Sequence, residues 1–359
     1  MDDSFTFLMF LLLPPLAGGL LALLFYFRFA RSKPSNSGWK RVLLANIVAF
    51  AGMVLLAFLG GEIYFRHIHD TTDSIAYTKV ARQWIERYCV YNSAGFRDNV
   101  QYSLEIEPGK SRVSFVGDSF TAGHGIKSVE ARFPNLIRAA HPEWEIHVLA
   151  RFGIDTGMEL RLLQQSVADG YKFDQVVLVY CLNDIADLFP EWSDALYRLM
   201  ADAERGGWLR RHSFFLDTIY HRYRAARDPV LNNYYSFVKD GYRGELWNVQ
   251  KERLKAIRDL VEANGGRLLA VTFPFIHESG DDYEYAFVHK QLDQLWNELG
   301  VPHLDLMPVL KVHPSGQIVV NRFDAHPNEF ANQLVARAVD EFLNEQLRAS
   351  PPAPTQGQN

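Results

Sequence analysis

Between residues 113 and 347, short apolar runs alternate with longer segments in which apolar residues recur at helical spacing. Short runs of β-branched and aromatic residues are typical of buried strands, and the longer segments are typical of amphipathic helices. The predicted strands are Val113–Val116, Glu145–Ala150, Gln175–Val179, Arg267–Phe273 and Pro302–Leu306. The predicted helices are Glu130–Ala140, Thr156–Val167, Leu246–Ala263, Tyr283–Leu299 and Pro327–Leu347. This alternation predicts an α/β fold, with a parallel sheet that carries helices on both faces.

The first predicted strand breaks abruptly into Gly117-Asp118-Ser119, and a turn of small residues follows as far as Gly123. A strand that ends in this way exposes the Ser119 hydroxyl at the carboxyl edge of the sheet, where open α/β sheets bind ligands. We expect Gly117 to tighten the turn by adopting backbone angles that a side chain would forbid. The alternative is an ordinary strand cap, in which Asp118 and Ser119 bond their own backbone.

Two later stretches favour a catalytic interpretation. Asn183 follows the third predicted strand, and Asp324 and His326 precede the closing helix. A serine, a strand-end asparagine and a late Asp/His pair, in this order, resemble the SGNH (GDSL) family of serine hydrolases and esterases over roughly residues 92–347. The resemblance implies a flavodoxin-like fold. Residues 91–98 also resemble a lead-in found in membrane-attached bacterial members of this family.

The resemblance implies a catalytic triad. Ser119 would attack an ester carbonyl, His326 would accept its proton, and Asp324 would orient the imidazole. Residues at i and i+2 of an extended segment point to the same side, so Asp324 and His326 can meet. In the commonest family spacing the aspartate stands three residues before the histidine, a position that Phe323 occupies here. A Ser–His pair steadied by a backbone carbonyl is the alternative.

The resemblance also implies an oxyanion hole, formed by the backbone N–H groups of Ser119 and Gly153 and the side-chain amide of Asn183. The sequence departs from the family pattern at Arg151, where an asparagine is usual, and at Cys181, where a glycine is usual. Asn183 could instead cap a helix. Similarly, His326 could be a surface histidine at the start of the last helix, since Pro327 suits a first helical position.

The N-terminal region holds two apolar blocks, at about residues 5–27 and 42–61. Each is long enough for a helix that crosses a bilayer, which needs about 20 apolar residues. The connection between them carries the basic residues Arg28, Arg31, Lys33, Lys40 and Arg41. Basic loops remain in the cytoplasm. The sequence therefore predicts a multi-pass protein of the inner membrane, with its N-terminus and catalytic domain on the periplasmic side.

These features predict the domain organisation. Residues 1–66 form a membrane anchor, residues 67–110 a juxtamembrane lead-in, and residues 111–348 the catalytic domain. The segment at about residues 186–244 is an aromatic-rich helical insertion, and residues 349–359 form a disordered tail. Because the insertion follows the strand of Asn183, it begins beside the site. It is either a cap that shapes a substrate pocket or an addition that packs on the sheet edge or leans towards the bilayer.

Composition excludes several classes of function. The net charge of −5 gives no electrostatic footprint for nucleic acid. The two cysteines are too few for a disulfide scaffold or a cysteine zinc site. Cys89 and Cys181 could pair in an oxidising compartment, but we favour a free thiol at Cys181, since it ends a buried strand. Gly117 and Gly123 lie near one another in the sequence, but the lysine that a phosphate-binding loop requires after its second glycine is absent. We expect neither a cofactor nor a metal.

The sequence therefore favours a membrane-anchored serine esterase that cleaves an acyl ester outside the cytoplasm. Its substrate would be a small molecule or a glycan ester, such as an O-acetyl group on envelope polysaccharide, or a lipid-like ester. An O-acyltransferase would use the same triad with a sugar hydroxyl as acceptor, and fold and triad do not separate the two. A non-catalytic envelope-binding or assembly module that retains the fold is a third hypothesis. Protein partners and oligomeric state are not indicated.

Overall fold

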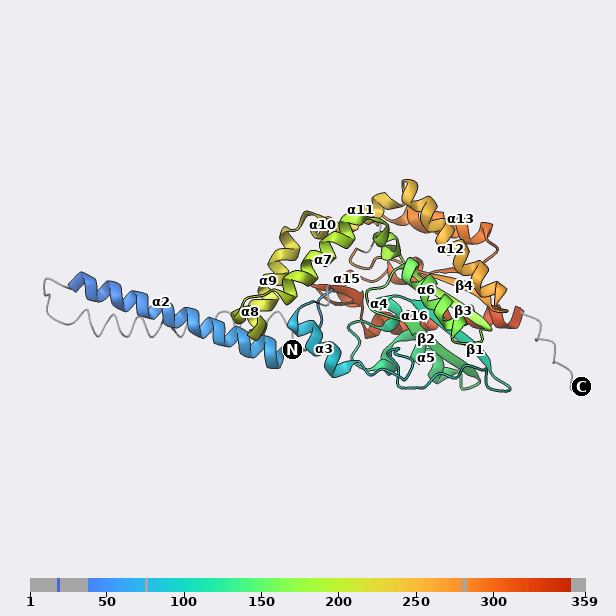
Figure 1. The fold of residues 1–359 in the computed structure, drawn as a ribbon, viewed down its shortest axis with the longest axis horizontal. Coiled ribbons are helices and arrows are strands. Elements are labelled where there is room, and N and C mark those ends of the chain that lie inside the picture. Colours follow the sequence, from blue (N-terminus) through green and yellow to red (C-terminus); the bar gives the residue numbers. More distant parts are fainter. Residues whose placement is uncertain (1–17, 20–37, 75–76, 279, 281–282, 350–359) are drawn as a thin grey trace, which may run out of the picture. The chain divides into compact units, whose positions relative to one another are not determined.

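The computed structural model of the protein describes residues 18–19, 38–74, 77–278, 280 and 283–349 (Figure 1). The chain divides into two compact units, which we name the helical unit and the sheet unit. The helical unit contains the described residues of Met1–Thr71, Ala76–Gln83 and Leu199–Arg227. The sheet unit contains those of Thr72–Ile75, Trp84–Arg198 and Asp228–Asn359. The first predicted membrane helix and the predicted tail lie almost entirely outside the described residues.

The sheet unit is built on five parallel strands. These are β1 (Ser111–Gly117), β2 (Trp144–Ala150), β3 (Gln175–Cys181), β4 (Arg267–Phe273) and β5 (His303–Asp305). Their order in space is β2-β1-β3-β4-β5, so β1 lies between β2 and β3. Gly117 is in register with Ala150 on one side and Val179 on the other, and the three strands therefore end side by side. The predicted parallel sheet is confirmed.

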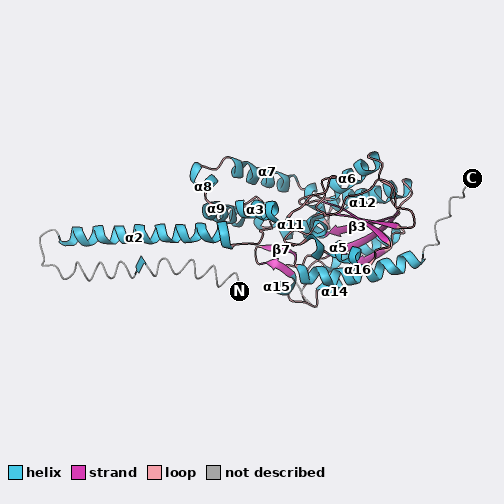
Figure 2. Ribbon diagram, turned by 90° about the horizontal axis from the view of Figure 1, so that it is seen from below, coloured by secondary structure: helices cyan, strands magenta, loops and turns pink. Residues whose placement is uncertain are grey.

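Helices cover both faces of this sheet (Figures 1 and 2). The helices of one face are α6 (Thr156–Ala168), α12 (Glu245–Ala263) and α13 (Ala286–Glu298), and those of the other are α5 (Phe133–Ala140) and α16 (Glu329–Ala349). Side chains alternate along each strand between the two apolar layers. In β1, for example, Phe115 packs with α5 and α16, whereas Val116 packs with α6 and α12. Both layers exclude water, which explains the unbroken apolar character of the strands.

An antiparallel ribbon that the sequence analysis did not predict follows the sheet. Its strands are β6 (Val319–Asn321) and β7 (Asp324–Pro327), and Asn321 pairs with Asp324. The pairing of Pro327 with Val319 keeps Pro327 out of the last helix, so α16 begins at Glu329. Shorter elements complete this part of the unit: α4 (Ser119–Ala122), η2 (Val129–Ala131), η3 (Leu182–Leu188), α14 (Met307–Leu310) and α15 (Ser315–Ile318).

The lead-in before β1 is tied to the loop that follows α4. Arg97, only 2% exposed, donates hydrogen bonds from Nη1 to the backbone carbonyls of Ala122 (3.1 Å) and Gly123 (2.5 Å). Its Nη2 bonds the carbonyl of Ile126. A buried guanidinium can thus satisfy several carbonyls of one irregular turn. The lead-in motif at residues 91–98 therefore has a structural role, in which Arg97 fixes the loop next to Ser119.

Asp98 lies at the centre of a buried ion-pair network. Its carboxylate accepts hydrogen bonds from both Nη atoms of Arg138 (2.9 and 2.7 Å) and from the Tyr102 hydroxyl, and it lies 3.1 Å from Arg132 Nη2. Burial opposes ionisation of Asp98, but the Arg138 hydrogen bonds and the charges of both arginines outweigh it and lower the pKa of Asp98 to about 2.

Asp98→Asn should lower the free energy of unfolding by about 3 kcal/mol, since it leaves two buried guanidinium groups without their anion. The folded-state pKa of Asp98 lies below its unfolded value, so this stabilisation is present above about pH 4 and is lost as pH falls towards 2. Thermal and urea unfolding of the purified protein measure the difference. Asp259→Asn, which breaks an exposed pair with Arg258, should cost less than about 1 kcal/mol. Equal effects of the two substitutions would contradict the assignment.

The helical unit contains α2 (Gly38–Ile63), which continues into a turn of π-helix, η1 (Tyr64–Ile68). Among the described residues, Gly38–Ile68 is the one helix long and apolar enough to cross a membrane, and it coincides with the second predicted apolar block. At its end, Glu62 accepts hydrogen bonds from Ser213 Oγ (2.7 Å) and from the amides of Phe214 and Phe215. Glu62 therefore satisfies the free N–H groups at the start of α9 (Phe214–Arg227).

The predicted insertion is helical but does not form one body. Its other helices are α7 (Pro190–Glu204), α8 (Trp208–His212), α10 (Pro229–Asn232) and α11 (Tyr234–Gly241). Residues 199–227 belong to the helical unit, where α9 packs on α2 and η1. In the sheet unit α11 packs on η3, and the Tyr242 hydroxyl after it donates to the Leu182 carbonyl (2.8 Å). The later part of the insertion thus buttresses the segment that carries Asn183. Helix α3 (Lys79–Tyr88) contributes its residues up to Gln83 to the helical unit and those from Trp84 onwards to the sheet unit.

Candidate active site

The end of β1 presents Ser119 through a short, capped turn. Asp118 is the N-cap of α4, and its Oδ1 accepts the amide of Phe120 (2.8 Å). A Cβ on Gly117 would lie 2.3 Å from Thr121 Oγ1 and 3.0 Å from the Val179 carbonyl oxygen. Gly117 does not have a positive φ. The expectation that it adopts unusual backbone angles is therefore wrong, and lack of space between β1, β3 and α4 is the reason for glycine here.

The structure brings Ser119, His326 and Asp324 together. Ser119 Oγ lies 2.7 Å from His326 Nε2, and His326 Nδ1 lies 2.5 Å from Asp324 Oδ1. The backbone amide of His326 also donates to Asp324 Oδ1 (3.1 Å). Asp324 is fully buried, whereas Ser119 and His326 each remain 9% exposed. The carboxylate on Nδ1 assigns the proton to that nitrogen, which leaves Nε2 free to accept the serine proton.

The electrostatics of the pair favour an ionised carboxylate and a basic imidazole. Burial favours neutral His326, but the charge of Asp324 and its hydrogen bond outweigh burial and raise the pKa of His326. Burial likewise opposes ionisation of Asp324, yet the surrounding imidazoles and their hydrogen bonds hold its pKa well below the usual range. Asp324 is therefore charged wherever His326 can act as a base.

The three predicted oxyanion donors come from adjacent strand ends. Ser119 follows β1, Gly153 lies in the loop after β2 with a φ of +70°, and Asn183 lies in η3 after β3. Asn183 Nδ2 donates to Asp118 Oδ2 (3.3 Å), which uses one of its two N–H bonds and leaves the other for a ligand. Burial raises the pKa of Asp118, which lies beside Ser119. Asn183 does not cap η3, where Cys181 is the N-cap residue.

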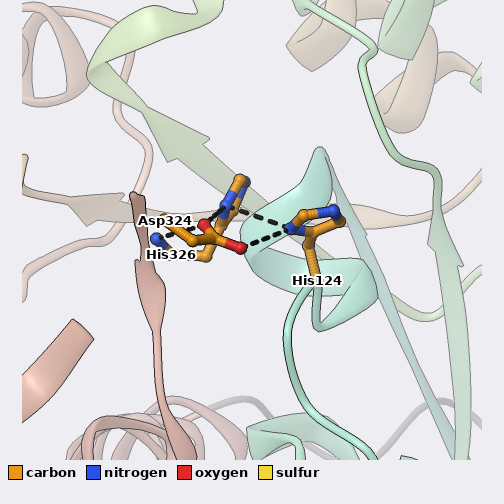
Figure 3. A group of neighbouring side chains, drawn as sticks. All are labelled: His124, Asp324 and His326. Carbon is orange, nitrogen blue, oxygen red and sulfur yellow. Dashed lines mark hydrogen bonds and ion pairs between the residues drawn. The ribbon is translucent and has the colours of Figure 1, made fainter. Parts of the chain in front are cut away.

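Sequence reasoning missed two further residues that contact Asp324, and one of them, His124, is drawn in Figure 3. The Thr72 hydroxyl donates to Asp324 Oδ2, although the two residues are 252 positions apart. His124 Nδ1 lies 3.2 Å from the same oxygen and 3.2 Å from His326 Nδ1. No sequence pattern pointed to Thr72. His124 lies five residues after Ser119, and its backbone amide bonds the Ser119 carbonyl (2.9 Å), so its proximity to the serine was the available signal.

His124, Asp324 and His326 also form the one group of potential metal ligands found among the described residues, with ligand atoms within 4.8 Å of one another. A divalent cation would suit two imidazoles and a carboxylate. These atoms, however, already hydrogen-bond to one another, and His326 presents its other nitrogen to Ser119. The arrangement is thus a hydrogen-bonded Ser–His–Asp group with a second histidine beside the carboxylate. Cys89 and Cys181 are both free thiols.

No protein-family model and no curated protein matches this sequence. Among solved structures, the chain is similar to a two-domain esterase active on acetylated mannans, at 11% identity and a TM-score of 0.37, covering 70% of this chain and 52% of that one. It is also similar to a lipolytic protein of the G-D-S-L family from Veillonella parvula, at 15% identity and a TM-score of 0.40, covering 64% and 97%. An extracellular lipase from Streptomyces rimosus has the same identity and TM-score, covering 66% and 99%. The chain spans about half the length of the two-domain esterase.

Proposed function

We propose that the protein is a serine esterase of the SGNH type, which cleaves acyl esters through a covalent acyl-enzyme. One observation carries this proposal: the continuous hydrogen-bonded line from Ser119 Oγ through His326 to Asp324. A serine hydroxyl becomes a nucleophile when a base removes its proton, and the base works best when a carboxylate fixes its tautomer. The hydrogen bonds between these three groups support the proposal, as does the 9% exposure that Ser119 retains.

The geometry supports the following steps. Ser119 Oγ bonds to the ester carbonyl carbon while its proton passes to His326 Nε2. The carbonyl π electrons move to the oxygen, and Asp324 stabilises the imidazolium. When the oxyanion collapses, the C–O bond to the alcohol breaks and His326 returns the proton to the leaving alkoxide. Water then repeats the sequence on the acyl-serine, which releases the acid and restores Ser119.

The developing oxyanion would be stabilised by donors from the three adjacent strand ends. We assign this role to the backbone N–H groups of Ser119 and Gly153 and to the free N–H of Asn183. The bond from Asn183 to Asp118 orients this amide before substrate binds. Preorganised donors of this kind are each worth about 10²–10³ in rate. The packing of α11 on η3 supports the position of Asn183.

We further propose that the enzyme is anchored in the inner membrane through its N-terminal apolar segments, with the sheet unit on the periplasmic side. The apolar helix Gly38–Ile68 is consistent with one span. The basic connection before it favours a cytoplasmic start, and therefore an external end, for this helix. In this location the accessible esters are O-acetyl groups of envelope polysaccharides and lipid-like esters.

Product analysis of the full-length protein in detergent tests hydrolysis. We expect release of free acid from p-nitrophenyl acetate, and of free acetate from an acetylated polysaccharide, with added oligosaccharide remaining unmodified in mass spectra. Comparison with p-nitrophenyl octanoate separates acetyl from lipid-like esters. An acetylated oligosaccharide as the main product would show an acyltransferase instead. Rates equal to those of Ser119→Ala with every ester would leave only a non-catalytic module.

A further inference from the structure

The carboxylate of Asp324 is held from two sides (Figure 3). Its Oδ1 accepts His326 Nδ1 and the His326 backbone amide. Its Oδ2 accepts the Thr72 hydroxyl and faces His124 Nδ1 at 3.2 Å. A carboxylate with donors on both oxygens cannot rotate about its Cβ–Cγ bond without breaking hydrogen bonds in a buried site. The donors that bind Oδ2, Thr72 and His124, therefore also hold Oδ1 in its position facing His326.

His124 is built into this position. It is 2% exposed, and its ring lies against the rings of Trp84, Phe152 and His326, with centroids 5.8, 5.2 and 4.4 Å away. Its Nε2 is buried and has no hydrogen-bond partner among the described residues. The polar contacts of the ring are therefore made through Nδ1, which lies 3.2 Å from Asp324 Oδ2 and 3.2 Å from His326 Nδ1.

The charge state of His124 follows from its surroundings. The titratable and charged groups that face it are Asp324, His326 and Arg97. Burial lowers the pKa of His124, and the charges of His326 and Arg97 act in the same direction against the opposing effect of Asp324. The ring is therefore neutral and carries one N–H. Because the acceptor lies at Nδ1, we assign the proton to that nitrogen.

We propose that His124 is a positioning residue of the triad, which donates its Nδ1–H to Asp324 Oδ2 and thereby keeps Oδ1 directed at His326. This inference rests on the proposed esterase function. His124 acts through Asp324 and does not touch the reacting atoms. Its own backbone is bonded to Ser119, through the His124 amide and the Ser119 carbonyl (2.9 Å). Ser119 and His124 thus lie on one short turn, which Arg97 holds by hydrogen bonds. His124 in turn positions the Asp324 carboxylate, which is distant in sequence.

Two substitutions separate the hydrogen bond from the volume of the ring. His124→Asn places an amide N–H where the imidazole has Nδ1, whereas His124→Phe retains a ring and removes the donor. We expect His124→Phe to lower kcat for p-nitrophenyl acetate about tenfold, which corresponds to one charge-assisted hydrogen bond. KM should stay within about threefold. His124→Asn should retain kcat within about threefold of the unsubstituted protein.

The pH dependence of kcat/KM supplies a second test. If His124 had only a structural role, its substitution would not shift this dependence. When Asp324 loses one donor, its charge acts more strongly on His326 and favours the imidazolium. The acid limb of kcat/KM should therefore move to higher pH by about half to one unit in His124→Phe. In His124→Asn it should remain at the position of the unsubstituted protein. His313→Phe, a histidine replaced outside the site, should change neither kcat nor the limb.

His124→Gln, whose amide reaches the Nε2 position, replaces His124→Phe if that variant does not fold, and the same result is expected of it. The inference is overturned if the Asn and Phe variants lose kcat equally, or if the Phe variant keeps the kcat and the acid limb of the unsubstituted protein. A different result is expected if the proposed esterase function itself is wrong. The unsubstituted protein would then turn over ester no faster than Ser119→Ala.

Discussion

Replacement of Ser119 by alanine is expected to lower p-nitrophenyl acetate turnover by about 10⁴- to 10⁶-fold. In the proposed mechanism the substitution removes the atom that forms the acyl bond, and His326 Nε2, 2.7 Å from Ser119 Oγ, then has no proton to accept. The assay compares kcat of the two full-length proteins in the same detergent, after subtraction of spontaneous hydrolysis. Intact-mass analysis during turnover should also show an acyl adduct on the unsubstituted protein only.

Folding of Ser119→Ala is the necessary control, and the substitution should leave the unfolding temperature nearly unchanged because it deletes one oxygen at a partly accessible position. A Ser119→Ala protein that is folded and still cleaves ester at the original rate would remove Ser119 as nucleophile. Ser119→Thr is a second check, since it retains the hydroxyl but adds a methyl group to a packed turn.

Asp324→Asn should lower kcat on the order of 10⁴-fold. An amide in this position can donate to His326 Nδ1, which would then carry its proton on Nε2 and could not accept one from Ser119. The fully buried side chain and its short contact with Nδ1 make the tautomer depend on this one group. The measurement is kcat over a range of pH, with the unsubstituted protein beside it.

The pH at which kcat/KM rises on the acid side of these profiles is also predicted, together with the direction in which Asp324→Asn shifts it. Because the pKa of His326 is raised, kcat/KM of the unsubstituted protein should rise with pH through a value above about 6.5. Loss of the negative charge in Asp324→Asn removes the main cause of this rise, so the residual activity should titrate at lower pH. An acid limb that stays in place would contradict the electrostatic role of Asp324.

A matched control exists in the same unit. Asp305 Oδ1 lies 2.8 Å from His289 Nδ1, a second aspartate–histidine pair that is separate from the serine. Asp305→Asn breaks this pair and should leave kcat and the acid limb unchanged, whatever it does to stability. An equal loss of activity in the two variants would show that the effect at Asp324 arises from general destabilisation.

The sequence was most informative where a local pattern determines the structure. Unbroken apolar runs predicted all five parallel strands within two residues at either end, because strands buried on both faces tolerate few polar residues. Ser119 and Asn183 follow the ends of two of these strands, β1 and β3, so the edge that carries the candidate site was also predictable. The i, i+2 spacing of Asp324 and His326 was sufficient to expect their contact, which the structure contains.

Other features depend on contacts that no local pattern records. Strands β6 and β7 are only three and four residues long, too short for an apolar run or an alternating pattern, so they gave no strand signal. Thr72 binds Asp324 across 252 positions of sequence. The reason for glycine at position 117 lies in the neighbouring strand and helix rather than in its own backbone angles. Likewise, the insertion is aromatic-rich along its whole length, so its sequence does not indicate that residues 199–227 pack in the helical unit and the rest in the sheet unit.

The short segment Thr72–Ser74 runs alongside β7. The amide of Ser74 bonds the Phe323 carbonyl (2.9 Å), its hydroxyl accepts the Ala325 amide (3.2 Å), and the Thr72 carbonyl accepts Asn321 Nδ2 (2.9 Å). These bonds make residues 72–74 an extra edge for the ribbon that carries His326 and Asp324. A shortened form of the protein that is to preserve this ribbon must therefore keep residue 72 onwards. Replacement of the N-terminal segment by another leaves these bonds intact only if the junction lies upstream of that threonine.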